Sequence, residues 1–149
     1  MSKKPNILLI MCDQLRASAL GCYGNRVART PWMDFLARDG VRYEEAYSQT
    51  PVCVPARYGL LAGLNPCRMG LWDNAEGSVK VENPFPELLN REGYATCAVG
   101  KTHFMPSRAP YGFQKKYSSE EIPEYFEDDD YLQFLESRGY GSIDEPHGR

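Results

Sequence analysis

The sequence has no long hydrophobic run and no excess of positive charge, and each absence excludes a class of protein. Its longest apolar run near the start, residues 7–12, stops at Asp13 and is too short to span a bilayer. With 17 basic and 20 acidic residues the net charge is −3, which gives no general attraction to nucleic acid or to anionic membranes. We therefore expect no nucleic-acid partner and no membrane partner.

Paired cysteine motifs are also missing. The chain has five cysteines, an odd number, and none of them forms a C-x-x-C pair. This argues against a disulfide framework and against a zinc site. Four of the five are expected to be small buried hydrophobic residues, namely Cys12, Cys22, Cys67 and Cys97.

A secretory signal is not indicated either. Lys3 and Lys4 precede the apolar run, but the run is shorter than a signal-peptide core and no small-residue cleavage site follows it. We expect a mature start and a cytoplasmic protein. A length of 149 residues is enough for one domain with a sizeable core.

The first apolar run indicates the fold class. Residues 6–12 are rich in Ile and Leu and lie between Pro5 and Asp13, which is typical of a strand buried on both faces of a parallel sheet. In such α/β folds functional groups gather just past the carboxyl ends of strands. Asp13 and Gln14 occupy that place.

Local signals predict further elements up to residue 63. Thr30-Pro31 suits the start of a helix with an apolar face, which Gly40 would end. Residues 41–47 are predicted to form a strand. A short helix is then predicted to end near Gly63, with Cys53 at or just before its N-terminus, where anions are favoured.

The rest of the chain again places polar residues past the end of an apolar strand. A helix over residues 86–91, closed by Gly93, precedes a strand over 94–99, and the polar residues 100–103 lie past the strand end. The acidic run 120–130 indicates a helix start on a solvated surface rather than a metal site. The tail 142–149 has no apolar pattern.

The stretch Cys53-Val54-Pro55-Ala56-Arg57 is the most specific in the chain. Alone, a cysteine near an arginine is either a reactive thiol or a buried cysteine beside a surface arginine. With residues 58–63 following, the stretch closely resembles the sulfatase signature. In that family the cysteine is oxidised to formylglycine, whose aldehyde hydrates to a geminal diol.

Three more segments resemble the same family in the same order: residues 5–14, 30–41 and 100–104. The motif-bearing region covers about 5–113, whereas 114–149 is acidic and carries none of these motifs. The resemblance implies that residues 1–149 are the N-terminal part of a sulfatase catalytic domain. The implied fold is an alkaline-phosphatase-like α/β sandwich with a mostly parallel central sheet flanked by helices, of which only the N-terminal part is present.

The resemblance also implies a metal. Asp13, Gln14 and the modified Cys53 would supply oxygen ligands to Ca²⁺, or to Mg²⁺ or Mn²⁺. Ca²⁺ takes about six to eight oxygens, so further ligands would come from elsewhere. A helix N-cap is the structural alternative for Asp13.

Three other residues receive roles from the family. Arg57 would hold the diol oxygen and offset its charge, and Lys101 would bind a sulfate oxygen. His103 would assist the deprotonation that expels sulfate. Without the resemblance, Lys101 would be interpreted as a surface lysine and His103 as a structural histidine.

The implied function is hydrolysis of a sulfate monoester, as in arylsulfatases and choline sulfatases. Many members carry two aspartates where this chain has Asp13-Gln14, and that pair also occurs in phosphonate monoester hydrolases, so a phosphonate or phosphodiester hydrolase is an alternative. Lys101-x-His103 favours a sulfatase. Asp73-Asn74 is either a turn or a substrate contact.

A third alternative is a non-catalytic fragment, because the family's remaining metal ligands and a further catalytic lysine and histidine come from later segments. The only other histidine here is His147, in the tail. The expected partners are a small sulfated substrate and a formylglycine-generating enzyme. A truncated sheet exposes an edge and an apolar face, so self-association is also expected.

Overall fold

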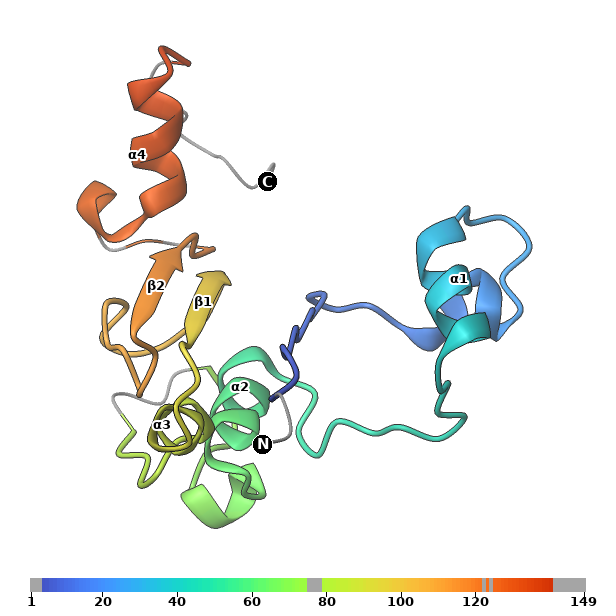
Figure 1. The fold of residues 1–149 in the computed structure, drawn as a ribbon, viewed down its shortest axis with the longest axis horizontal. Coiled ribbons are helices and arrows are strands. Elements are labelled where there is room, and N and C mark those ends of the chain that lie inside the picture. Colours follow the sequence, from blue (N-terminus) through green and yellow to red (C-terminus); the bar gives the residue numbers. More distant parts are fainter. Residues whose placement is uncertain (1–3, 75–78, 122, 124, 141–149) are drawn as a thin grey trace. The chain divides into compact units, whose positions relative to one another are not determined.

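The computed structural model describes residues 4–74, 79–121, 123 and 125–140 (Figure 1). It divides into two compact units, residues 1–47 and 48–149, and each is described by itself. No helix in the described ranges has both the length and the apolar character that crossing a membrane requires.

The first unit is built around helix α1, Pro31–Asp39. Its start is as predicted, with Pro31 in the first turn and Thr30 immediately before it. The Thr30 hydroxyl donates to the Asp34 carboxylate at 3.0 Å, and that carboxylate also accepts from the Cys22 amide at 2.7 Å. Asp34 therefore ties α1 to the short 3₁₀ turn Gly21–Tyr23, which follows a second such turn, Ala17–Ala19.

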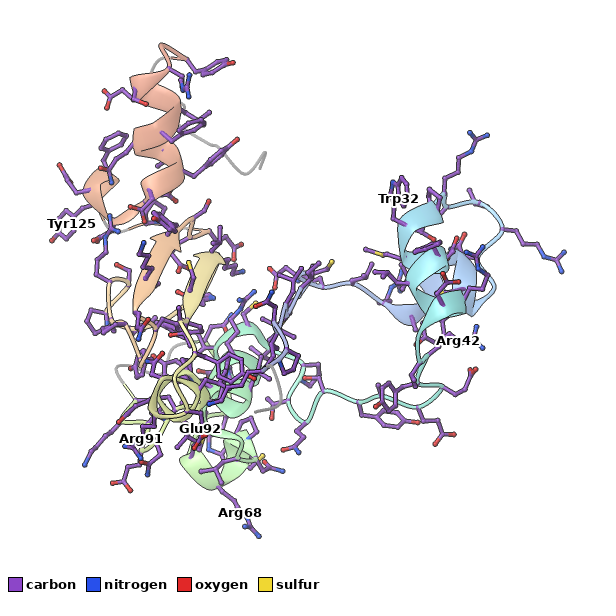
Figure 2. All side chains as sticks on the ribbon, viewed as in Figure 1. Trp32, Arg42, Arg68, Arg91, Glu92 and Tyr125 are labelled. Carbon is purple, nitrogen blue, oxygen red and sulfur yellow. The ribbon has the colours of Figure 1, made fainter. Side chains whose placement is uncertain are left out.

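The two strands predicted for this unit, over 6–12 and 41–47, are wrong in this structure. A strand needs a neighbour that completes its hydrogen bonds, and residues 4–47 contain no strand. The apolar run is consequently exposed, with Leu8 at 84% and Ile10 at 71%. The apolar face of α1 is exposed too, and Trp32 projects from it (Figure 2).

The second unit contains three helices: α2 Cys53–Ala62, α3 Phe85–Arg91 and α4 Asp130–Ser137. All three confirm the sequence prediction. Gly63 ends α2 in the left-handed region (φ 64°), which glycine adopts without steric cost. Short 3₁₀ turns cover Pro66–Met69 and Phe126–Asp128.

A two-stranded parallel sheet joins β1, Cys97–Gly100, to β2, Lys115–Ser118. Figure 1 shows the two arrows side by side and pointing the same way. The predicted strand 94–99 thus begins later than expected, and β2 was not predicted. Cys97 pairs with Lys115 and Gly100 with Ser118, so the carboxyl ends of both strands meet at one edge.

The core of the second unit lies between α2 and the segment that follows β1. Its buried members are Val54, Tyr58, Leu61, Leu71 and Phe104. The rings of Tyr58, Phe104 and Tyr111 contact one another with centroids 4.9 to 5.7 Å apart. Such tilted aromatic contacts are favourable beyond the area they bury. This aromatic cluster fixes the chain after β1 against α2.

The four cysteines predicted to be buried are not: Cys12, Cys67 and Cys97 are exposed and Cys22 is partly exposed. Each lies on a turn, an unpaired segment or the outer side of the small sheet, where no neighbouring element covers it. All five cysteines are free thiols.

Candidate active site

Cys53 is the first residue of α2 and is partly buried. Val52 before it is extended, and Val54 and Pro55 after it are buried in the core. The amide of Val54 donates to the side-chain oxygen of Asn74 at 2.9 Å. The thiol is therefore held at a helix N-terminus by packing on one side and by an amide cap on the other, in a place that favours negative charge.

Lys101 and Arg57 bring positive charge to this thiol. Lys101 Nζ lies 3.8 Å from Cys53 Sγ. Arg57, one turn along α2 and buried, donates from its guanidinium to the main-chain carbonyl of Lys101. Gly100 ends β1 with φ 95°, a left-handed conformation that lets the chain turn from the strand toward α2. Cys53, Arg57 and Lys101 are thus brought together as the sequence predicts.

His103 lies on the same loop in a constrained environment. Its backbone is left-handed (φ 55°), which is uncommon for a non-glycine residue. Its Nδ1 is buried and has no hydrogen-bond partner among the residues that the structure describes. Burial first, and then the charge of Lys101, lower the pKa of His103 below its usual 6.5; Glu120 opposes this shift, Arg57 adds a smaller lowering effect, and Glu121 opposes it least. The ring is therefore neutral near pH 7.

The loop that carries Lys101 and His103 is also fixed at its far end. The hydroxyl of Tyr58, from α2, accepts from the amide of Met105 at 2.9 Å and contacts the Tyr111 hydroxyl at 3.1 Å. Burial and the bond to Tyr111 raise the pKa of Tyr58, so this hydroxyl stays protonated. Arg57 and Tyr58, adjacent on α2, thus hold both ends of one loop.

Three residues near the site were missed by the sequence analysis. Asn74, interpreted as a turn residue, lies at a turn but also caps α2 at Val54. Glu120 is buried, and Glu121 pairs with Lys101 at 2.8 Å, whereas the acidic run was expected to be solvated. One signal in the sequence could have pointed to Asn74. The helix that begins at Cys53 is preceded by Val52, whose side chain cannot accept a hydrogen bond, so a capping acceptor had to come from elsewhere in the chain.

The three predicted metal ligands belong to different units of the chain. Asp13 and Gln14 form a turn in the first unit, Gln14 with a left-handed backbone (φ 53°), whereas Cys53 belongs to the second unit. Among the described residues no group of three or more His, Cys, Asp or Glu side chains converges as a metal site would require. The oxygen donors of Asp13 and Gln14 suit a hard cation in their chemistry.

The second unit therefore combines a thiol at a helix N-terminus, a lysine ammonium beside the thiol and a buried arginine one turn along the same helix. A neutral histidine follows two residues after the lysine. Comparison with known proteins identifies this arrangement. The family model described as Sulfatase matches residues 5–145. The chain belongs to the sulfatase family. The resemblance predicted from the four motifs is confirmed.

Curated sulfatases match over about 111 residues. Arylsulfatase D of Homo sapiens is 40% identical over 67% of this chain, and an arylsulfatase of Clostridium perfringens is 38% identical over 74% of it. These matches cover 19% and 23% of the two relatives. This sulfatase chain thus spans about a fifth to a quarter of the length of the curated relatives it matches.

Solved structures confirm the fold class. The crystal structure of Ps i-CgsB has a TM-score of 0.72 and 32% identity, and covers 95% of this chain and 34% of its own. The phosphonate monoester hydrolase of Agrobacterium radiobacter has a TM-score of 0.72 and 25% identity, covering 96% of this chain and 30% of its own. The chain is a portion of the alkaline-phosphatase-like α/β fold, as predicted.

Proposed function

We propose that this chain carries the nucleophile half of the active site of a sulfate monoester hydrolase, with Cys53, converted to formylglycine, as the nucleophile. The observation that carries the proposal is the contact of Lys101 Nζ with Cys53 Sγ at 3.8 Å, at the N-terminus of α2. A cation and a helix N-terminus at one sulfur form a place for an anionic ester. Membership of the sulfatase family and the sulfatase names of its relatives support the same reaction class.

Each neighbouring side chain has a task that its chemistry suits. Lys101 would bind a sulfate oxygen as a point charge, and the buried guanidinium of Arg57 would offset charge on the oxygen that replaces the sulfur of Cys53. His103, neutral because burial lowers its pKa, would accept the proton whose removal expels sulfate. Glu121, now paired with Lys101, would give way to the substrate's sulfate.

The metal belongs to this proposal. Asp13, Gln14 and the modified Cys53 would hold a hard divalent cation such as Ca²⁺, and that cation would polarise the sulfate ester when bound. Conversion of Cys53 would require a formylglycine-generating enzyme as a partner. The sulfated substrate would be a small molecule.

Intact mass of the Cys53 peptide tests the nucleophile. The complete gene product carrying these residues, expressed with a formylglycine-generating enzyme, should lose about 18 Da at Cys53. It should hydrolyse an aryl sulfate, and Cys53→Ala should abolish turnover, while Cys67→Ala, at an exposed cysteine, should leave it unchanged. Turnover by a protein whose Cys53 is an unmodified thiol would refute the nucleophile.

The 149-residue chain alone is expected to turn over slowly or not at all, because it spans only about a fifth to a quarter of the length of the curated relatives it matches and the family's remaining metal ligands come from later segments. The assay is aryl sulfate hydrolysis by the converted chain with added Ca²⁺. Robust turnover would mean that the remaining ligands are dispensable.

A second candidate is hydrolysis of a phosphonate monoester or phosphodiester. It is favoured by the similarity to the phosphonate monoester hydrolase structure and by Gln14 beside Asp13. The kcat/KM values of the converted complete protein for an aryl sulfate and for an aryl phosphodiester separate the two. Faster cleavage of the diester would overturn the sulfatase proposal and support this one.

A further inference from the structure

Beneath the loop with Lys101 and His103 lies a buried carboxylate, that of Glu120, which is only 5% exposed. One of its oxygens accepts from the Thr102 amide at 2.9 Å and from the Thr102 hydroxyl at 2.6 Å. The other accepts from the His103 amide at 2.9 Å. Both oxygens are thus engaged by two successive residues of the loop.

The backbone of Glu120 is itself fixed by a hydrogen bond to Asp129. Its amide donates at 3.0 Å to the carboxylate of Asp129, which is fully buried and caps α4 through the amides of Tyr131 and Leu132. The Glu120 side chain therefore reaches the loop from a backbone that β2 and α4 fix on either side. A carboxylate in such surroundings is a rigid acceptor rather than a mobile surface charge.

The hydrogen bonds to Glu120 are made by the part of the loop, Thr102 and His103, that includes the backbone conformation least favourable without support. His103 has a left-handed backbone, and its amide donates to Glu120. Lys101, one residue before Thr102, is anchored through its carbonyl by Arg57, and Met105 through its amide by Tyr58. Glu120 supplies the anchor in the middle, between the two residues to which the proposed function gives chemical roles.

We propose that Glu120 is a positioning residue of this site, which holds the Lys101 ammonium and the His103 ring in their working places through the amides of Thr102 and His103. The inference rests on the proposed function for its effect on turnover, but not for the contact itself. Glu120 touches neither the substrate nor Cys53, and acts through the loop.

Glu120→Gln is the sharpest variant because it keeps size and shape. A glutamine amide has one acceptor oxygen and one NH₂ donor, so at either Thr102 or His103 a donor would meet a donor. Thr102→Val is a milder second variant that removes only the hydroxyl bond. Glu136→Gln, at an exposed position on α4, makes the same chemical change away from the loop and is the matched control.

In the complete converted protein, Glu120→Gln should lower kcat for an aryl sulfate by about 10- to 100-fold, because small displacements of catalytic groups are costly. Thr102→Val should lower kcat less, and Glu136→Gln not at all. Hydrogen exchange of the peptide covering residues 101–105 should become faster in Glu120→Gln, with exchange in β1 and conversion of Cys53 unchanged.

Unchanged exchange in that peptide would overturn the proposal, as would an unchanged kcat in an active protein. If the converted wild-type protein hydrolyses no sulfate ester, the proposed function fails, while the exchange measurement still decides on Glu120. Loss of exchange protection throughout β1 as well would show a general structural role and would also overturn it.

Discussion

At the scale of the single residue, the charge on His103 is the most directly testable property of the site. Burial first, and then Lys101 and Arg57, lower its pKa below 6.5. A His147→Gln variant leaves His103 as the only histidine, so its ring can be titrated by NMR without ambiguity. We expect a pKa clearly below 6.5, and a value at or above 6.5 would contradict the geometry around the ring.

The same shift affects stability. Because the pKa of His103 is lower in the folded chain than in the unfolded chain, the unfolded state takes up the proton first as pH falls. The contribution of His103 to the free energy of unfolding should therefore be constant well above pH 6.5 and should decrease from there down through the folded-state pKa. In His147→Gln, the further change His103→Gln should remove this decrease.

The resemblance to the sulfatase family predicted part of the site. Cys53 and Arg57 lie one turn apart on a helix, and Lys101 and His103 follow a strand end, so each pair lies within one short motif that the resemblance could identify. Asn74 and Glu120 were not predictable in this way. Their partners Val54 and Thr102 lie 20 and 18 residues away, and only the folded chain brings them together.

At the scale of secondary-structure elements, the Tyr58 hydroxyl is the joint between α2 and the loop after β1. Tyr58 is fully buried, so Tyr58→Phe leaves the Met105 amide without its acceptor. We expect a loss of about 1–2 kcal/mol in the free energy of unfolding, measured by denaturant unfolding of the chain. Tyr117→Phe, half exposed on β2, is the control and should change stability little. Equal free energies of unfolding for the two variants would mean that the hydrogen bond from the Met105 amide to the Tyr58 hydroxyl does not stabilise the fold.

The helices were predicted and the strands largely were not, for a physical reason. Proline and glycine start and stop helices locally, as Pro31 and Gly63 do here. A strand depends on a partner: Lys115–Ser118 has no apolar pattern and becomes β2 only by pairing with β1. The apolar run 6–12 has the strand pattern, but the described residues of its unit, 4–47, form no strand that could pair with it.

At the scale of the whole molecule, the exposed apolar run near the start predicts self-association. Ile7, Leu8 and Ile10 are 63%, 84% and 71% exposed, more contiguous apolar surface than soluble monomers usually show. Leu8→Lys should lower the apparent mass of the 149-residue chain in light scattering coupled to gel filtration. Val27→Lys, at an isolated residue 92% exposed, is the control and should not. A monomeric wild-type chain would contradict the prediction.

The length of the chain bears on whether it is an active sulfatase or a non-catalytic fragment. A non-catalytic fragment remains an alternative for the 149-residue chain, because the chain spans only about a fifth to a quarter of the length of the curated relatives it matches. The family and the fold class follow from the comparisons independently of the metal and the substrate.

Lys101 contributes two separate groups to the site, its ammonium at Cys53 and its carbonyl at Arg57. Truncation of the side chain removes the first and leaves the second in place. Lys101→Ala should therefore keep the shape of the loop and open a space for a small cation beside residue 53. Such a variant is suited to chemical rescue, in which methylammonium from solution restores part of the lost turnover in proportion to its concentration.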